Sequence, residues 1–286
     1  MTGCTAAGSL TRTGGNTYGG FAGLLTNNGT TLDKCSAEVL VTSNDASYNG
    51  AFIGIVDSGT VLIKRCFATG NVKSNQTHVS TFVARINQAS GKTLNVTIEN
   101  CFATGSIEGS NQVRGGLVGS AEAATSLTIS KCYASGSIVG SFRLGGLIGN
   151  LNNTAAVVEN CAAWNSEVTA GTYGNANWSS GAVIGTAHPN SHLTNNYRKR
   201  DMSITAYWVP SIDYSQPDVD GTTHPLTDSA GAEMSDTSMA SGQSHYPIYP
   251  YHGKVESGKN LSQLASTTLG WSSDVWNFSG PLPLLL

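Results

Sequence analysis

A seven-residue stretch occurs three times in the chain, as Cys66-Phe67-Ala68-Thr69-Gly70-Asn71-Val72, Cys101-Phe102-Ala103-Thr104-Gly105-Ser106-Ile107 and Cys132-Tyr133-Ala134-Ser135-Gly136-Ser137-Ile138. In each copy, Cys, Ala, Gly and Val or Ile alternate with aromatic, hydroxyl-bearing or amide-bearing residues. An alternation with a period of two is typical of a β-strand with one buried face. The stretch therefore predicts a strand whose cysteine faces the core.

The cysteines extend this repeat in both directions along the chain. They are Cys4, Cys35, Cys66, Cys101, Cys132 and Cys161, at spacings of 31, 31, 35, 31 and 29 residues. A second marker, of the form Gly-apolar-apolar-Gly, recurs in phase and ends at Gly23, Gly54, Ala84, Gly119, Gly149 and Gly185. Such short strands bury their apolar side only by stacking coil on coil. We predict an all-β fold over residues 1–197, a parallel β-solenoid of about six coils with a period of about 31 residues.

Departures from the period predict where the chain leaves the regular coil. Extra residues around 88–92 and 170–180 indicate longer loops, and the repeat fades with Tyr197 in the cysteine place. From residue 198 the composition shifts toward Pro, His and Trp. A solenoid needs its last coil covered, so we predict that residues 198–286 form a C-terminal capping segment packed on the solenoid, with Trp208, Trp271 and Trp276 as apolar anchors. A short helix is expected at residues 260–269.

We expect all six cysteines to be structural, reduced and buried. Cysteines of stacked coils lie about 4.8 Å apart, whereas a disulfide needs Cβ atoms about 3.8 Å apart. The thiols then act as small apolar groups. No pair has the close spacing of a zinc site, and neither His188 with His192 nor Asp218 with Asp220 completes a metal motif. We therefore predict neither a metal nor a cofactor.

Aromatic residues directly after three of the cysteines are the first candidate site. If the cysteines point inward, Phe67, Phe102 and Tyr133 point outward and line up on consecutive coils. This aromatic stripe is either covered by the C-terminal segment or exposed to a ligand or partner. The candidate ligand-binding residues are these three together with Tyr173 and Trp178 in the loop of the sixth coil.

Composition excludes several classes of partner. The 286 residues carry a net charge of -3 with 12% charged residues, so the chain has no basic field for nucleic acid. It also lacks the run of about 20 apolar residues that membrane insertion needs. Because Cys4 already stands in the repeat frame, we expect the chain to be a fragment of a longer polypeptide, with Met1 supplied for expression and any signal or anchor missing.

The second marker carries a family resemblance. Gly115-Gly116-Leu117-Val118-Gly119-Ser120 and Gly145-Gly146-Leu147-Ile148-Gly149-Asn150, each followed by a Cys-aromatic-Ala or Cys-Ala-Ala strand, resemble the GLUG-motif repeats of large bacterial surface proteins, including adhesin-like proteins of Bacteroidetes. The ending from Leu269-Gly270-Trp271 is similar to the segment that closes such arrays. The third coil departs from the motif with Thr81-Phe82-Val83-Ala84-Arg85. The resemblance implies a β-solenoid at the cell surface.

Three functions remain open. The first is a non-enzymatic, adhesin-like module, extracellular or on the outer cell surface, which acts as a monomer and presents loops and a β-face to a glycan or protein on a host or neighbouring cell. The second is a polysaccharide lyase or hydrolase, which needs converging carboxylates or a base with an acidic or metal partner. Only the acids between residues 213 and 236 could assemble such a site. The third is a purely structural stalk or spacer.

Overall fold

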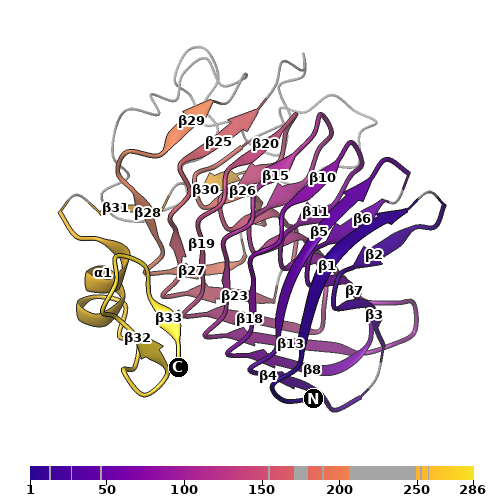
Figure 1. The fold of residues 1–286 in the computed structure, drawn as a ribbon, viewed down its shortest axis with the longest axis horizontal. Coiled ribbons are helices and arrows are strands. Elements are labelled where there is room, and N and C mark those ends of the chain that lie inside the picture. The colour runs from indigo at the N-terminus through magenta and orange to yellow at the C-terminus, as the bar shows by residue number, and fades with distance from the viewer. Residues whose placement is uncertain are drawn as a thin grey trace.

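The computed structural model describes the whole chain apart from residues 13, 27, 46, 154, 171–179, 189, 206–248, 252 and 257. The described residues form a parallel β-solenoid, which confirms the predicted fold class (Figure 1). Strands of successive coils pair in parallel, for example Phe67 with Phe102 and Phe102 with Tyr133. These partners are one cysteine period apart, so each coil sits directly on the previous one.

Four sheets run along the solenoid. The long sheet contains β1 (Thr5–Arg12), β5 (Ser36–Ser43), β9 (Phe67–Ala68), β10 (Val72–Ser74), β14 (Phe102–Ala103), β15 (Ile107–Glu108), β19 (Tyr133–Ala134), β20 (Ile138–Gly140), β24 (Ala162–Ala163), β25 (Glu167–Ala170), β28 (Tyr197–Lys199), β29 (Ser203–Thr205) and β31 (Lys254–Glu256). The five-stranded sheet contains β2 (Thr17–Gly19), β6 (Tyr48–Gly50), β11 (Val79–Ser80), β16 (Arg114–Gly115) and β21 (Leu144–Gly145).

The chain passes next into the seven-stranded and six-stranded sheets. The seven-stranded sheet contains β3 (Ala22–Leu25), β7 (Ile53–Val56), β12 (Val83–Asn87), β17 (Val118–Ala123), β22 (Ile148–Leu151), β26 (Ile184–Ala187) and β30 (Tyr249–Tyr251). The six-stranded sheet contains β4 (Thr30–Asp33), β8 (Gly59–Lys64), β13 (Leu94–Glu99), β18 (Ser126–Ser130), β23 (Ala156–Glu159) and β27 (His192–Thr194).

The core consists of columns of similar side chains stacked along the solenoid axis. Phe21, Phe52 and Phe82 from the second marker form one such column, with ring centroids 4.8 Å apart at each step. Leu117, Leu147 and Val183 continue it and are fully buried. Stacked rings and aliphatic groups bury their surface against a copy of themselves, which accounts for the regular spacing of the marker.

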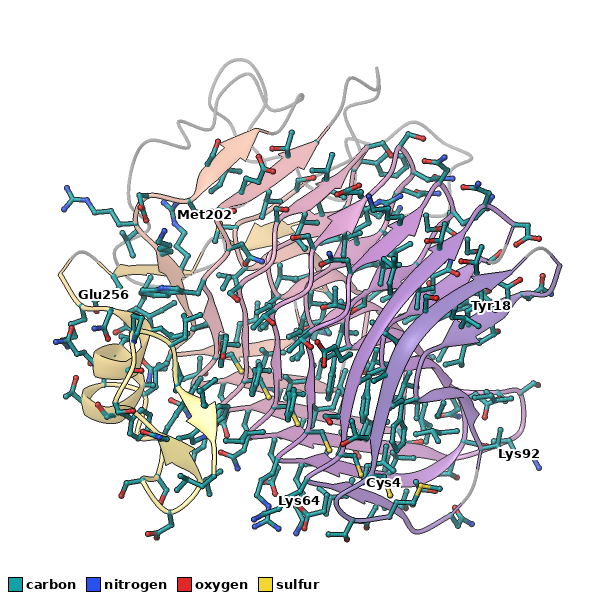
Figure 2. The ribbon with its side chains drawn as sticks, in the orientation of Figure 1. Cys4, Tyr18, Lys64, Lys92, Met202 and Glu256 are labelled. Atoms are coloured by element: carbon teal, nitrogen blue, oxygen red, sulfur yellow. The ribbon has the colours of Figure 1, made fainter. Side chains whose placement is uncertain are left out.

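The cysteine column lies at the turn between the six-stranded sheet and the long sheet. Cys35, Cys66, Cys101, Cys132 and Cys161 are buried and free, as predicted. Cys4 is exposed, because the described residues place no coil over the first one, so the prediction that all six are buried is wrong there. Figure 2 shows the row of sulfur atoms that leads away from the labelled Cys4.

The thiols do more than fill space at this turn. The residue before each of these cysteines has a left-handed backbone, for example φ of 52° at Asn100 and 53° at Lys131. The cysteine N–H then donates to the Sγ atom of the next coil, at 3.3 Å from Cys35 to Cys66 and 3.4 Å from Cys66 to Cys101. Because a buried N–H without a partner is costly, the sulfur column stabilises the turn.

In the seventh coil, the structure shifts the predicted alignment with the repeat by one residue. Tyr197 pairs with Ala162 on the long sheet, so it continues the outward aromatic column and does not occupy the cysteine place. That place belongs to Asn196, whose Oδ1 atom accepts a hydrogen bond from the N–H of Cys161 at 3.1 Å. An amide oxygen therefore replaces the sulfur as acceptor.

A sharp turn joins the five-stranded and seven-stranded sheets, and we call this corner the crease. The backbones approach so closely that side chains have no room: a Cβ atom on Gly149 would lie 2.6 Å from the carbonyl oxygen of Gly119 and 2.7 Å from backbone atoms of Arg114. Gly50 is equally tight, since its Cβ would lie 2.0 Å from the oxygen of Ile53. Gly54, Gly119, Gly149 and Gly185 of the second marker are therefore favoured by the close approach of the backbones, whereas Gly23 in the first coil has open space and the third coil has Ala84 in this place.

Two described strands of the C-terminal part extend the sheets of the solenoid. β30 pairs antiparallel with β26, and β31 pairs parallel with β28, so both add to the last coil. Parallel pairing of the coil itself continues beyond residue 197, because β29 pairs with β25. The predicted helix is present as α1 (Leu261–Thr267), whose N-cap Asn260 forms a capping box with Gln263.

Replacing Gly149 by Ala tests the crease. The added methyl group must push two backbones apart, so we expect Gly149→Ala to destabilise the fold by about 1–3 kcal/mol or more. Gly23 is the matched control, because it is the first glycine of the same column and its Cβ would meet no atom within 4 Å. Thermal unfolding followed by circular dichroism measures both variants. Equal melting temperatures for Gly149→Ala and Gly23→Ala would contradict this account of the crease.

Candidate functional site

The predicted aromatic stripe exists on the outer surface of the long sheet. Phe67 and Phe102 stack with centroids 4.9 Å apart and an angle of 4° between the rings, and Phe102 and Tyr133 stack at 5.1 Å and 6°. Parallel pairing of β9, β14 and β19 holds the three rings in register. The inference that residues after the cysteines point away from the core is therefore correct.

The C-terminal segment, residues 258–286, covers this stripe. It contains α1, β32 (Trp276–Asn277) and β33 (Leu284–Leu285), which gather beside the solenoid (Figure 1). The ring centroid of Trp276 lies 6.2 Å from that of Phe102 and 6.1 Å from that of Tyr133. Phe102 is 4% exposed and Tyr133 is 0% exposed. Of the two alternatives for the stripe, cover by the C-terminal segment holds, and these two rings are not an exposed ligand surface.

Three hydrogen bonds fix the segment in place. Trp271 Nε1 donates to the carbonyl oxygen of Asn160 at 2.9 Å, and Trp276 Nε1 donates to Asn100 Oδ1 at 3.1 Å. The hydroxyl of Tyr133 donates to the carbonyl oxygen of Pro283 at 3.0 Å. Burial also raises the pKa of Tyr133. The polar ends of all three aromatic side chains therefore have partners, as buried polar groups require.

The other candidate ligand-binding residues have different outcomes. Phe67, at the edge of the covered stripe, is half-buried. Tyr173 and Trp178 lie outside the described residues, as does the cap anchor Trp208. The acids between residues 213 and 236, on which the enzyme alternative depends, lie outside them as well.

A second group of side chains meets across the crease. We call it the crease cluster: Tyr48, His78, Arg85, Glu122 and Arg143. Tyr48, His78, Val113 and Arg143 stand at the same position of four successive coils on the five-stranded side, and all but Val113 belong to the cluster. Arg85 lies on β12 of the seven-stranded sheet, and Glu122 lies on the adjacent strand β17, next to a register shift. The turn between the two sheets thus brings together residues more than 70 positions apart, such as Tyr48 and Glu122.

Glu122 is the centre of the crease cluster. Its Oε1 atom accepts hydrogen bonds from Ser120 Oγ at 3.0 Å and from His78 Nε2 at 2.9 Å, and its Oε2 atom pairs with the guanidinium of Arg85. Burial would raise the pKa of Glu122, but the hydrogen bonds and charges of His78 and Arg85 outweigh it and lower the pKa to about 2. Glu122 is therefore a carboxylate at neutral pH.

Arg85 connects Glu122 to Tyr48. Its guanidinium donates to the Tyr48 hydroxyl at 2.6 Å and lies 4.8 Å from the centroid of that ring. The Tyr48 ring also lies 5.2 Å from the His78 ring. A planar cation over an aromatic face is a favourable contact, so the Arg85 guanidinium interacts with both Glu122 and Tyr48.

Arg143 is the charged member of the cluster that has no ion pair among the described residues. Its Nε atom is buried and has no hydrogen-bond partner, and its guanidinium lies 6.0 Å from the Phe142 ring. Burial lowers its pKa, and the charge of Glu122 acts in the opposite direction. Arg85 and Arg143 contribute two positive charges and Glu122 one negative charge, so the cluster retains a positive charge even with His78 neutral.

The backbone at the crease is strained on three consecutive coils. His78, Val113 and Arg143 have φ values of 53°, 60° and 53°. A left-handed backbone is particularly unfavourable for a β-branched residue such as valine and costs on the order of 1–3 kcal/mol. The residues before the cysteines have the same left-handed φ, for example 52° at Asn100, so this backbone is a feature of both tight turns of the coil.

Sequence reasoning did not find the crease cluster. Its five-stranded column reads Tyr48, His78, Val113 and Arg143, so no letter repeats along it. The signal that was present is the departure of the third coil, Thr81-Phe82-Val83-Ala84-Arg85, in which an arginine follows the second marker. Arg85 is the residue that pairs with Glu122.

The long loop predicted at residues 88–92 borders a separate open cleft of about 630 Å³. Its lining is largely polar and comes from Thr26, Asn28, Asp57, Ser58, Gly59, Ala89, Gly91, Lys92 and Thr93. The loop is tied to the second coil, because Ala89 N–H donates to the carbonyl oxygen of Asp57 at 2.8 Å. The cleft offers hydrogen-bonding groups and fewer converging charges than the crease.

The fold and the crease cluster define a β-solenoid with a polar, net positive outer corner. In comparisons with protein-family models, curated proteins and solved structures, nothing matched the chain. Within the described ranges, no group of three or more His, Cys, Asp or Glu residues is arranged to hold a metal. No helix among the described residues is long and apolar enough to cross a membrane.

Removing a tryptophan from the C-terminal segment tests how the stripe is covered. We expect Trp276→Ala to lower the free energy of unfolding by about 3–5 kcal/mol, because a fully buried aromatic side chain leaves a cavity. Urea unfolding and binding of a hydrophobic dye to the native protein measure the change. Leu284→Ala is the control in the same segment, since Leu284 is 55% exposed. An equal loss from both variants would show that the stripe does not depend on Trp276.

The low pKa of Glu122 makes a prediction about pH. Because its folded pKa of about 2 lies below the ordinary value of 4.5, its contribution to stability is complete above pH 4.5 and is lost as the pH falls toward 2. We expect Glu122→Gln to be less stable than the wild type at neutral pH, with the difference shrinking across that window. Glu108→Gln is the control, since Glu108 is largely exposed and pairs with Lys73. A difference that stays constant from pH 6 to pH 2 would contradict the prediction.

Proposed function

We propose that the chain is a non-enzymatic, adhesin-like extracellular surface module that binds a glycan or a protein on a host or neighbouring cell. The observation that carries the proposal is the crease cluster, which places aromatic, cationic, carboxylate and imidazole groups on one outer corner over four coils. Tyr48, Arg85 and Glu122 lie on paired strands, and His78 and Arg143 each directly precede one. Binding groups on rigid elements lose little entropy when a ligand arrives.

The chemistry of the cluster favours binding over turnover. A general acid or base works best with a pKa near the operating pH, whereas the pKa of Glu122 is about 2. Its oxygens already accept from His78, Arg85 and Ser120. Glycoside hydrolysis needs two carboxyl groups facing one bond, and among the described members of the cluster only Glu122 carries one. The enzyme alternative would depend on residues elsewhere.

A structural spacer would not need this cluster. Burying charges and straining the backbone both cost free energy, and a spacer could place neutral residues at these positions, as the sixth coil does with Thr186. The resemblance of the second marker to GLUG-motif repeats of bacterial surface proteins supports an extracellular setting. It also agrees with the low charge of the chain.

The test is a binding screen joined to an assay for turnover. We expect the folded chain to bind at least one component of a glycan array or a panel of host matrix proteins, and heat-unfolded chain to lose that binding. Each bound polysaccharide is then incubated with the protein and assayed for new reducing ends and for unsaturated sugar products. Release of either product would establish the enzyme alternative, and binding to no component would favour the spacer.

A further inference from the structure

We propose that the crease binds an acidic polysaccharide, with Arg143 as the residue that holds a carboxylate or sulfate group of the ligand. This inference rests on the proposed function and specifies its site and its ligand class. It begins from a side chain whose interactions are incomplete in the chain itself.

Arg143 has an unmet requirement for an anion. A guanidinium that leaves water loses hydration, and a partner of opposite charge normally compensates for it. Arg143 is partly buried, yet among the residues that the structure describes its Nε atom has no hydrogen-bond partner and its guanidinium forms no ion pair within 4 Å. The planar fork of an arginine binds carboxylates and sulfates through two parallel hydrogen bonds, so an anion from a ligand would complete its interactions.

Glu122 is not available as that partner. It contributes an attractive charge to Arg143, but Ser120, His78 and Arg85 already occupy its two oxygen atoms. The charged and titratable groups of the cluster are thus divided into two parts. Glu122 pairs with Arg85 and His78. The Nε atom of Arg85, like that of Arg143, has no hydrogen-bond partner among the described residues, but Arg85 has an ion pair there and Arg143 has none, so the positive charge of Arg143 is left for an incoming group.

The arrangement along the axis suits an extended chain. His78, Val113 and Arg143 stand on consecutive coils, so about 10 Å separates the levels of His78 and Arg143 at a coil spacing of about 4.8 Å. An extended sugar chain advances per sugar unit by a distance similar to the spacing between two coils. A ligand lying across the coils would therefore place one acidic sugar at Arg143 and the next sugars near His78 and Tyr48, whose half-buried side chains offer imidazole and ring contacts.

The charge of the protein favours a sugar acid over nucleic acid. The whole chain has a net charge of -3, which opposes a ligand with a phosphate at every step. Among the described residues, the crease offers one cation without an ion pair, Arg143, beside the half-buried side chains of Tyr48 and His78. Sparse acid groups among many hydroxyls are the chemistry of an acidic polysaccharide.

The experiment compares ligands that differ only in their acid groups. The probes are oligogalacturonate and its methyl ester for carboxylates, and dextran sulfate and dextran for sulfates, each measured by isothermal titration calorimetry with the full chain. We expect one of the acidic probes to bind at least about tenfold more tightly than its neutral counterpart. The acid whose affinity is higher identifies the group that Arg143 holds. Raising the salt concentration should weaken that binding.

Arg143→Asn tests the anchor. Asparagine tolerates the left-handed backbone at this position, where φ is 53°. We expect affinity for the acidic probe to fall at least about tenfold and affinity for the neutral probe to stay unchanged. Lys131→Asn is the matched control, because Lys131 has the same φ of 53° and the same charge but stands in the turn column where Asn100 and Asn160 already occur. This control should bind as the wild type does.

A second variant, Arg143→Lys, keeps the inference testable if Arg143→Asn does not fold. Arg143→Lys keeps the positive charge but removes the planar fork, so we expect an unchanged melting temperature and affinity for the acidic probe reduced several-fold. Equal binding of acidic and neutral probes, or full affinity in both Arg143 variants, would overturn the inference and leave the proposed function standing. Tighter, Arg143-dependent binding of polyglutamate would assign the crease to an acidic peptide. Binding to no glycan and no matrix protein would refute both proposals.

Discussion

The parallel stacking of coil on coil is the constraint on which the rest of the structure depends. Each residue lies about 4.8 Å from its equivalents in the coils above and below, so every inward position must pack against a near copy of itself. Phenylalanine meets this condition by stacking, as Phe52 does on Phe82. A column of like charges fails it because the charges repel, which agrees with a chain that has only 12% charged residues.

The same constraint explains why the two markers differ in chemistry. At the cysteine turn the chain needs an acceptor for a buried N–H, and sulfur supplies it until Asn196 replaces it. At the crease the chain needs space, and glycine supplies it by having no side chain. Function has room only on outward positions, where residues in one column are free to differ, and the crease cluster occupies such positions.

The sequence predicted the features that recur from coil to coil and missed the crease cluster, whose residues differ between coils. Residues that recur at a fixed spacing predicted the period, the parallel sheets, the inward cysteines and the outward stripe. The local pattern after Asn260 predicted the short helix. The one-residue error at Tyr197 arose because an aromatic residue was placed in a column that in fact needs an acceptor. The crease cluster leaves only the departure of the third coil at Arg85 as a signal in the sequence, since Tyr48, Arg85 and Glu122 become neighbours only through a turn whose angle no single repeat reveals.

The C-terminal cover of the stripe has a consequence for the order of folding. Residues 258–286 are synthesised after the coils that carry Phe67, Phe102 and Tyr133, so a growing chain exposes a stack of apolar rings until its last residues emerge. The bond between Trp276 and Asn100 joins positions 176 residues apart, and contacts of such long range form late and slowly. In the interval the nascent coils present an apolar surface that is prone to association until the C-terminal segment packs on it.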